Sequence, residues 1–305
     1  MKILVFTEKP FAPAAVKAIE NTVNASGNDL EVVEEGTRAD LLEAIKDADG
    51  LIVRSDKITA DIMDAAPNLK VIVRAGAGYD NIDLEAATKH GICVMNTPGQ
   101  NSNAVAELVF GMIIMMCRNQ YNGKSGSEVK GKRLGLYAFG QVGRNVARIA
   151  KGFCMQVSAL DKFVPDVMME GEGVKPLHTP EELFSQNDFV SLHIPATKET
   201  KGSIGYDLVM KMPKNAVLVN TARKEVIDEA GVVRAMTERE DLKYITDIAP
   251  DAQAEMAGKF GKRFFATAKK MGAETAEANI NAGLAAARQI VDFFKTGDTR
   301  FQVNR

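Results

Sequence analysis

The sequence predicts an α/β protein of two domains, each built around a parallel sheet. Short apolar, β-branched runs alternate with helical patterns along the whole chain, which is typical of strands joined by crossover helices. The chain has 305 residues, more than one typical hydrophobic core requires. A polar, glycine-rich stretch near residue 122 also separates two such series. Two α/β domains therefore fit both the length and the pattern.

The first series contains four apolar runs that we expect to form buried strands. Helical patterns at 13–23 and 40–48 lie between the first two of these runs. The four runs are KILVF (2–6), GLIVR (50–54), KVIVRAG (70–76) and ICVMN (92–96).

The second series follows an apolar helix predicted around residues 105–119. That segment contains Glu107 and is too short to cross a bilayer. The polar run NGKSGSEVKGKR (122–133) is expected as a surface connection. The closing run RFQVN (300–304) is a candidate strand returning to the first domain. Further strands are predicted for RLGLYAF (133–139), QVSALD (156–161), FVSLHIP (189–195), NAVLVNTA (215–222) and YITDIA (244–249).

The composition excludes several classes of partner. Apolar residues make up 46% of the chain, charged residues 26%, and the net charge of −2 implies no broad attraction to nucleic acid or to an anionic membrane. Cys93, Cys117 and Cys154 form no metal-type or redox-type pair, so no metal site is predicted and the cysteines are expected to pack in the core. The N-terminus resembles a first strand and not a secretory signal, which favours a cytoplasmic protein.

A glycine-rich turn indicates a dinucleotide site. In YAFGQVGRNVA (137–147) a predicted strand leads into a predicted helix, and Gly140 and Gly143 fill two of the three glycine positions of G-x-G-x-x-G. Ala138 fills the first position, which it can do if its φ is negative. Asp161 ends the next strand, where a carboxylate binds a ribose 2′-hydroxyl and favours NAD over NADP, although Lys162 beside it acts in the opposite direction. The alternative is an αβ turn that binds nothing.

The segment from 57 to 108 identifies the family. Its RAGAGYDNID run and its N-x-P-x-x-N…VAE pattern closely resemble the D-2-hydroxyacid dehydrogenases, most of all the phosphoglycerate dehydrogenase type. AFGQVGR, SLHIP and LVNTARKEVIDE extend the match over most of the chain. The resemblance implies two Rossmann-like domains, with a cofactor domain (99–284) inserted into a substrate domain (1–98 plus 285–305). It also implies NAD-linked oxidation of 3-phosphoglycerate to 3-phosphohydroxypyruvate, the first step of L-serine biosynthesis.

The resemblance also assigns roles to residues. Arg223 matches the arginine that holds the substrate carboxylate, a role that suits a planar guanidinium, although a surface ion pair is the alternative. Asp247 matches an aspartate that meets the nicotinamide carboxamide. The other positions expected to line the cofactor are Ala138, Gly140, Gln141, Val142, Gly143, Asp161, His193, Ile194, Thr221 and Ala222.

An anionic substrate is expected to bind the first domain. Arg54 and Arg74 end two predicted strands there, and the backbone amides of a glycine-rich turn suit anions. The alternative is that both arginines neutralise nearby carboxylates. The resemblance places Arg54, Ser55, Arg74, Gly76, Ala77, Gly78 and, more weakly, Asn101 at this site.

The chain departs from the family at the catalytic histidine. His90, His178 and His193 are its only histidines, and none follows position 193. Alignment of ATAKKMGAET (266–275) puts Lys270, or alternatively Lys269, in its place. A free lysine has a pKa of about 10.4, and lowering it by about 3 would require about 4 kcal/mol. We expect burial, the adjacent lysine and Arg223 to act in that direction.

The assisting carboxylate is displaced as well. The family glutamate aligns with Ala252, so Asp251 is the expected substitute. If Lys269 and Lys270 are only a solvated pair, activity would be weak or lost. Three hypotheses remain open: a phosphoglycerate dehydrogenase, a dehydrogenase of another small 2-hydroxy acid, and a non-catalytic NAD(H)-sensing protein. A homodimer without a C-terminal regulatory domain is expected.

Overall fold

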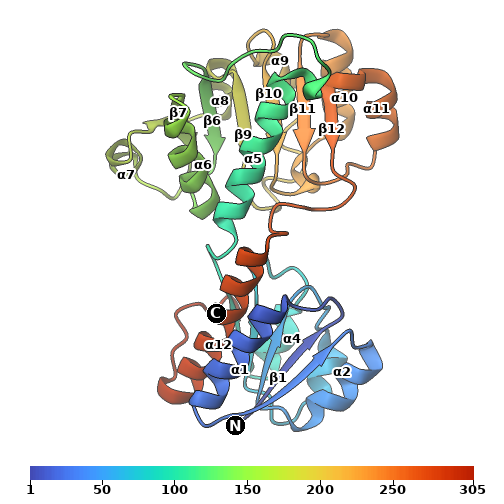
Figure 1. Ribbon diagram of the computed structural model, residues 1–305, viewed down its shortest axis with the longest axis vertical. Coiled ribbons are helices and arrows are strands. Elements are labelled where there is room, and N and C mark those ends of the chain that lie inside the picture. Colours follow the sequence, from blue (N-terminus) through green and yellow to red (C-terminus); the bar gives the residue numbers. More distant parts are fainter. The chain divides into compact units, whose positions relative to one another are not determined.

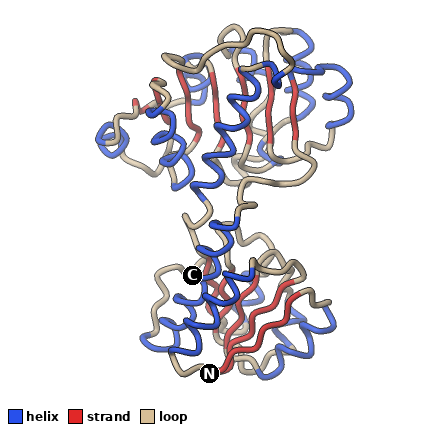
Figure 2. The backbone as a smooth tube through the Cα atoms, viewed as in Figure 1, coloured by secondary structure: helices blue, strands red, loops and turns tan.

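A computed structural model describes all 305 residues and divides them into two compact units. The first unit contains residues 1–101 together with 274–305, and the second contains 102–273. The second unit is therefore inserted into the first in sequence, as the colours of Figure 1 show. Figure 2 shows that each unit contains both helices and strands. Of the predicted domain limits, the one at 284/285 falls inside helix α12 (Ala276–Thr296), all of which belongs to the first unit.

The first unit has a five-stranded parallel sheet in the order β2-β1-β3-β4-β5. The four predicted strands are confirmed, and β2 was missed. RFQVN forms no strand, only a single antiparallel bridge between Met95 and Gln302. The elements are β1 (Lys2–Thr7), α1 (Pro13–Ala25), β2 (Asp29–Glu34), α2 (Arg38–Ala44), η1 (Ile45–Asp47), β3 (Gly50–Val53), α3 (Ala60–Asp64), β4 (Val71–Arg74), α4 (Leu84–Lys89), β5 (Cys93–Asn96) and α12.

Alternating side chains of this sheet pack into two separate cores. Ile3 and Val5 of β1 point toward α1 and α12, whereas Leu4 and Phe6 point toward α2, α3 and α4. Both faces of a parallel sheet must be covered by helices, which explains why its strands are apolar throughout. Helix α12, far from α1 in sequence, packs beside it through Gly283.

The second unit has a seven-stranded parallel sheet in the order β12-β11-β10-β9-β6-β7-β8. All five predicted strands are confirmed with shorter bounds, and the polar connection at 122–132 is a loop. The elements are α5 (Ser102–Cys117), η2 (Asn119–Tyr121), β6 (Arg133–Tyr137), α6 (Gln141–Gly152), β7 (Gln156–Leu160), α7 (Asp166–Gly171), β8 (Lys175–Pro176), α8 (Pro180–Gln186), β9 (Phe189–Leu192), α9 (Tyr206–Lys211), β10 (Val217–Asn220), η3 (Lys224–Val226), α10 (Glu229–Glu238), β11 (Lys243–Thr246), α11 (Gln253–Phe260), η4 (Gly261–Arg263) and β12 (Phe264–Ala266).

Two layers of helices cover this second sheet. Helices α5 and α6 pack on one face, where they meet Val217 and Val219 of β10. Helices α8 to α11 pack on the other face, where they meet Leu218 of the same strand. Figure 1 shows α5 crossing the sheet on the near side. No helix of the chain is both long and apolar enough to cross a membrane.

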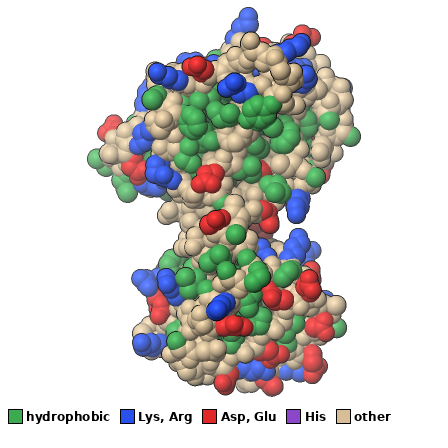
Figure 3. All heavy atoms as spheres, in the orientation of Figure 1, with side chains coloured by type: hydrophobic (Ala, Val, Ile, Leu, Met, Phe, Trp, Pro, Cys, Tyr) green, Lys and Arg blue, Asp and Glu red, His purple; other side chains and the backbone are tan.

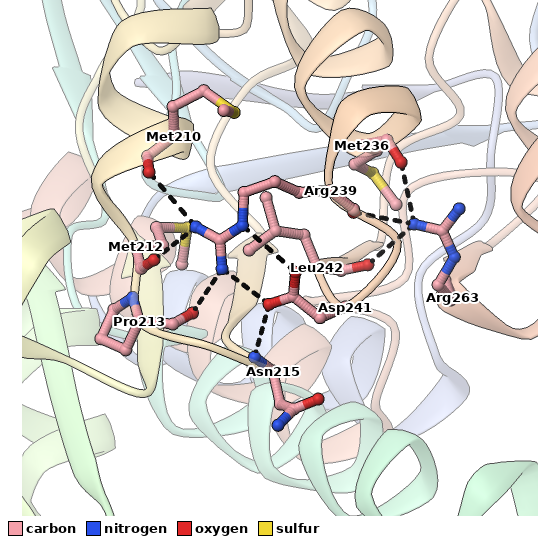
Figure 4. A network of polar contacts seen from close by, with 9 residues as sticks. All are labelled: Met210, Met212, Pro213, Asn215, Met236, Arg239, Asp241, Leu242 and Arg263. Carbon is pink, nitrogen blue, oxygen red and sulfur yellow. Dashed lines mark hydrogen bonds and ion pairs between the residues drawn. The ribbon is translucent and has the colours of Figure 1, made fainter.

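Two arginines join the ends of α9 and α10 at the amino end of β11. The Arg239 guanidinium donates to the carbonyls of Met210, Met212 and Pro213 and pairs with Asp241 at 2.6 Å (Figure 4). Arg263 donates to three carbonyls at the end of α10 and the start of β11. Arginine at a helix C-terminus satisfies carbonyls that the helix leaves unpaired. The hydrogen bonds from Arg239 hold the pKa of Asp241 below its ordinary value.

The mixture of charged side chains on the surface agrees with the net charge of −2. Acidic and basic side chains both occur on the visible face of each unit (Figure 3). The prediction for the cysteines is confirmed for Cys93 and Cys117, which are buried, and is wrong for Cys154, which is exposed and has a φ of +55°.

Candidate active site

In the second sheet the strand order reverses between β6 and β9. Strands β9 to β12 extend to one side of β6, and β7 and β8 extend to the other. Ligands of open parallel sheets bind outside the carboxyl ends of the strands at such a point. Nearly all the residues predicted to line a cofactor follow β6, β7, β9, β10 or β11 directly, so they lie along this one edge.

The glycine turn follows β6, as predicted. Gly140 is the N-cap residue of α6, and Gln141 and Val142 begin that helix. A β-carbon on Gly143 would overlap the carbonyl oxygen of Ala138, so this position requires glycine. Ala138 has a φ of +86°, so the condition under which alanine was expected to replace the first glycine is not met. An alanine in this left-handed region costs about 1–2 kcal/mol, which a glycine would avoid.

Asp161 fixes the shape of this turn. Its Oδ2 accepts from the backbone N–H of Phe139 at 2.7 Å, and its Oδ1 accepts from the N–H of Phe163 at 2.7 Å and of Val164 at 3.1 Å. The carboxylate therefore ties the glycine turn to the turn after β7. The neighbouring Lys162 pairs with Glu199 at 2.7 Å, which compensates its charge.

Three buried polar atoms at the ends of β9, β10 and β11 have no hydrogen-bond partner. They are Nε2 of His193, Oγ1 of Thr221 and Oδ1 of Asp247. A buried polar group without a partner costs about 1–3 kcal/mol, so three of them along one edge indicate that a polar ligand completes the site. Burial lowers the pKa of His193 to about 3, and the imidazole is therefore neutral at physiological pH. Ile194 follows it and is buried.

Arg223 and Lys270 meet at one backbone oxygen. The carbonyl of Ala222 accepts from Nη1 of Arg223 at 3.0 Å and from Nζ of Lys270 at 2.6 Å. Lys270 and Lys269 are both exposed, so the burial expected for Lys270 is not found. The backbone carbonyl of Lys269 accepts from the Thr267 hydroxyl. Of the two lysines, Lys270 is the one hydrogen-bonded beside Arg223.

Asp247 lies next to this pair and is completely buried. Burial raises its pKa, while the charge of Lys270, the N–H groups of Gly272 and Met271, and the charge of Arg223 oppose that rise. Its Oδ2 accepts from the Gly272 N–H at 2.7 Å. A β-carbon on Gly272 would come within 2.8 Å of the same oxygen, so a glycine is needed for this contact.

The carboxylate of Asp251 points elsewhere. It pairs with Lys224 at 2.6 Å and is largely exposed. The backbone around it is held by Glu229, whose two oxygens accept from the N–H groups of Asp251 at 3.0 Å and Ala252 at 2.8 Å. Glu229 was not predicted, because nothing in its local sequence links it to a loop twenty residues later.

Asn220 is a second residue that sequence reasoning missed. It is completely buried, its Nδ2 donates to the Arg223 carbonyl, and its Oδ1 accepts from the Ala222 N–H, both at 2.9 Å. It therefore braces the loop that carries Thr221, Ala222 and Arg223. An asparagine ending an otherwise apolar strand was the available signal.

In the first unit, Arg54 directly follows β3 and Arg74 is the last residue of β4, so both lie at strand ends, as predicted. Nη1 of Arg54 donates to the carbonyls of Lys9 at 3.1 Å and Pro10 at 2.7 Å, and its guanidinium lies over the Phe11 ring. Nε of Arg74 donates to the Arg54 carbonyl at 2.9 Å. Arg54 thus contacts two carbonyls and an aromatic ring. These contacts differ from the alternative, in which Arg54 pairs with a carboxylate.

The glycine-rich turn after β4 is shaped by Arg74. The Arg74 guanidinium occupies the space that a β-carbon on Gly76 would take, so the arginine packs directly against this turn. Ala77 accepts from the Asn96 side chain at 2.7 Å through its carbonyl. Of the remaining predicted positions, Ser55 is exposed, Gly78 is half-buried, and Asn101 directly precedes α5.

Together, the doubly wound second unit, its glycine turn and the unpaired polar edge define a dinucleotide-binding α/β protein. The sequence profile of the D-isomer specific 2-hydroxyacid dehydrogenases, catalytic domain, matches residues 3–304, and the chain belongs to this family of oxidoreductases.

Several relatives carry more specific names. A D-3-phosphoglycerate dehydrogenase of Methanocaldococcus jannaschii is 36% identical over 304 residues, 95% of this chain and 57% of that protein. The human D-3-phosphoglycerate dehydrogenase is 34% identical over 282 residues, 87% of this chain and 53% of that protein. A hydroxypyruvate reductase of Thermotoga maritima is 40% identical over 216 residues, 66% of this chain and 69% of that protein. The chain thus spans little more than half the length of these two phosphoglycerate dehydrogenases.

A solved structure matches over the whole chain. The NAD⁺-bound 3-phosphoglycerate dehydrogenase of Entamoeba histolytica is 51% identical, with a TM-score of 0.91, and covers 100% of this chain and 99% of that one. Its fold agrees with the two parallel-sheet units described above.

Proposed function

We propose that this protein catalyses the NAD-dependent oxidation of 3-phosphoglycerate to 3-phosphohydroxypyruvate, which would make it the enzyme of the first step of L-serine biosynthesis. Support comes from the 51% identity with the Entamoeba histolytica enzyme over the whole chain and from the phosphoglycerate dehydrogenases among the curated relatives. We further propose that it acts as a homodimer.

The residues at the edge of the second sheet fit NAD. The glycine turn at Gly140 and Gly143 would hold the pyrophosphate at the start of α6, and Asp161 would accept from the ribose hydroxyls. His193, Thr221 and Asp247 each offer a buried polar atom that still lacks a partner. Bound NAD supplies the acceptor for the hydride.

The meeting of Arg223 and Lys270 at the Ala222 carbonyl carries the proposal. Arg223 suits the substrate carboxylate because its planar fork forms paired hydrogen bonds. Lys270 then stands where it can take the proton of the substrate hydroxyl, as its neutral amine, or return that proton in the reverse direction, as its ammonium. Asp251 has only an indirect part, because it is paired with Lys224.

Neighbouring charges act in opposite directions on the balance between the neutral amine and the ammonium form of Lys270. The neighbouring Arg223 favours the neutral amine, whereas the Asp247 carboxylate favours the ammonium. Since Lys270 is exposed, burial adds little to the first effect. We therefore expect oxidation to be fastest at alkaline pH, where the amine is neutral, and reduction to tolerate lower pH.

In the first unit, we propose that Arg54, Arg74 and the turn at Gly76–Gly78 bind the anionic end of the substrate, together with Ser55 and Asn101. Arginine and backbone N–H groups are the groups that most often hold phosphate.

The test is NADH oxidation with 3-phosphohydroxypyruvate, measured from about pH 6 to pH 10 for wild type, Lys270→Ala and Lys269→Ala. Loss of a general acid typically lowers kcat by about 100-fold or more, which we expect for Lys270→Ala. Lys269→Ala is the matched control and should stay within a few-fold of wild type. Equal activity of both variants would rule out Lys270 as the proton donor, but it would not affect the proposed identity of the substrate.

The Thermotoga maritima relative favours a second candidate, reduction of hydroxypyruvate. The two are separated by comparing kcat/KM for hydroxypyruvate and for 3-phosphohydroxypyruvate with the same protein. A preference for hydroxypyruvate would assign the protein to a substrate without phosphate. NADH binding without turnover of either would favour the sensing protein.

A further inference from the structure

A polar pocket lies at the amino ends of the strands of the second unit. It has a volume of about 310 Å³ and includes residues that precede or begin four neighbouring strands, among them Lys132, Asp188, Asn215 and Lys243. In a parallel sheet these positions share one edge, opposite the edge that carries the glycine turn, Thr221 and Asp247. We call this cavity the amino-edge pocket.

The amino-edge pocket is positively charged. Lys132, Lys214 and Lys243 line it, and none of them forms an ion pair with a carboxylate. Asp188 is the one acidic residue of its lining. Although burial opposes it, hydrogen bonds from Arg133 hold the pKa of Asp188 below its ordinary value, and Arg133 pairs with this carboxylate at 2.6 Å. The Asp188 charge is therefore compensated mainly by Arg133, with a smaller contribution from Lys132, and the lining as a whole stays positively charged.

One wall of the pocket is a strained turn. Asn119, Gln120 and Tyr121 have φ values of +52°, +53° and +55°, and non-glycine residues rarely adopt this region even singly. Nδ2 of Asn119 donates to the Ser125 carbonyl at 2.8 Å and closes the turn. A β-carbon on Gly126 would overlap the Cys117 carbonyl, so the chain returns directly against the end of α5.

The opposite wall is held by a different contact. Asn215 also has a positive φ, +64°, and its backbone N–H donates to Asp241 at 2.7 Å. Asp241 in turn belongs to the Arg239 network, as Figure 4 shows. Strained backbone persists only where the surroundings determine it, and it often marks a functional site. Hydrogen bonds thus hold both walls of the amino-edge pocket in place.

We propose that the amino-edge pocket binds a small phosphate-bearing anion. Lys132, Lys214 and Lys243 supply the positive charge, and the hydroxyl and amide groups of Ser125, Ser127 and Asn119 supply neutral hydrogen-bonding partners. Its volume lies at the lower end of the range of small-molecule sites, which matches a metabolite with one or two phosphate groups. This site is separate from the proposed dehydrogenase site and does not rest on it.

The test uses inorganic pyrophosphate as the probe and the whole protein saturated with NAD, so that the glycine turn is occupied. Calorimetric titration at fixed ionic strength should show pyrophosphate binding to wild type. The double variant Lys214→Gln/Lys243→Gln should bind about tenfold more weakly or worse, since it loses two charges. Lys201→Gln, an exposed lysine after β9, is the matched control and should bind as wild type does.

Hydrogen exchange locates the bound probe. Residues 119–127 should gain protection on addition of pyrophosphate, and residues 138–143 should not change. Equal affinity of wild type and the double variant would overturn the proposal, as would the absence of binding to wild type. Protection confined to 138–143 would also overturn it, because the probe would then have replaced the cofactor phosphates.

Discussion

Burial sets the charge states of single residues at the carboxyl edge of the second sheet. His193 has its pKa lowered to about 3 by burial, and its Nε2 is fully enclosed although other atoms of the residue are accessible. The unfolded chain binds a proton at His193 below about pH 6.5, whereas the folded chain stays neutral down to about pH 3. Between these values the unfolded state binds more protons, so stability falls as pH falls.

Replacing His193 with asparagine should remove this acid sensitivity. We expect wild type to lose on the order of 2 kcal/mol more than His193→Asn between about pH 7 and pH 4.5. Urea unfolding at both pH values, with stability compared within each protein, measures the difference. The same pH dependence in both proteins would show that His193 already has an ordinary pKa in the folded state.

Within the motifs, the sequence predicted which strand ends carry the candidate residues, and the roles of these residues stay predictions. Lys270 was expected because the family histidine is absent, and the structure places its Nζ on the same carbonyl as Arg223. Asn220 and Glu229 were missed because they act on backbone groups, through contacts that only the folded loops bring together. The exposure of Lys270 could not be predicted either, since it depends on the path of the loop after β12.

At the scale of elements, α6 illustrates how one glycine sets the position of a helix. Gly143 faces the Ala138 carbonyl at the start of α6, and Gly152 ends the same helix with no atom near its missing β-carbon. Gly143 therefore allows α6 to pack closely against the end of β6. Gly152 has no such packing role, and it differs from alanine only in the flexibility of its backbone.

Alanine substitutions should separate these two roles. Gly143→Ala should destabilise the protein by about 1–3 kcal/mol, as overpacking does, and should weaken NAD binding because the helix start moves. Gly152→Ala is the matched control and should be neutral or stabilise by up to about 1 kcal/mol. Thermal unfolding and NAD titration of both variants test this. A Gly143→Ala protein as stable as wild type would show that α6 can shift without cost.

Element prediction failed at the sheet edges and at special backbone angles. Strand β2 was missed because it is an edge strand whose side chains are only partly buried, so its apolar signal is weak. The positive φ of Ala138 could not be predicted, because the turn geometry, and not the residue type, determines it. Central strands were found because both of their faces are buried.

At the scale of the whole molecule, the two units differ in whether one continuous segment of the chain supplies all the residues of their cores. Both cores of the second unit consist of residues from one continuous segment, 102–273. One core of the first unit needs Ala282, Ala286 and Ile290 of α12, which pack against α1 and the sheet. The first 101 residues therefore lack part of their own core.

Fragments should reflect this difference. We expect residues 102–273, expressed alone, to unfold cooperatively and to bind NADH. Residues 1–101 should show no cooperative transition unless residues 274–305 are supplied, because apolar surface of the sheet is left uncovered. Circular dichroism during heating measures both. Cooperative unfolding of residues 1–101 alone would contradict the role given to α12.

The late position of α12 has a consequence for protein synthesis. As the ribosome makes the chain, β1 to β5 emerge early, but the helix that covers one face of their sheet emerges only after the entire second unit. At 5–20 residues per second, the delay is on the order of 10–40 s. During that time the sheet face opposite α2, α3 and α4 is incompletely covered. We therefore expect the nascent chain to bind holding chaperones, and slow translation through 102–273 to lengthen its exposure to aggregation.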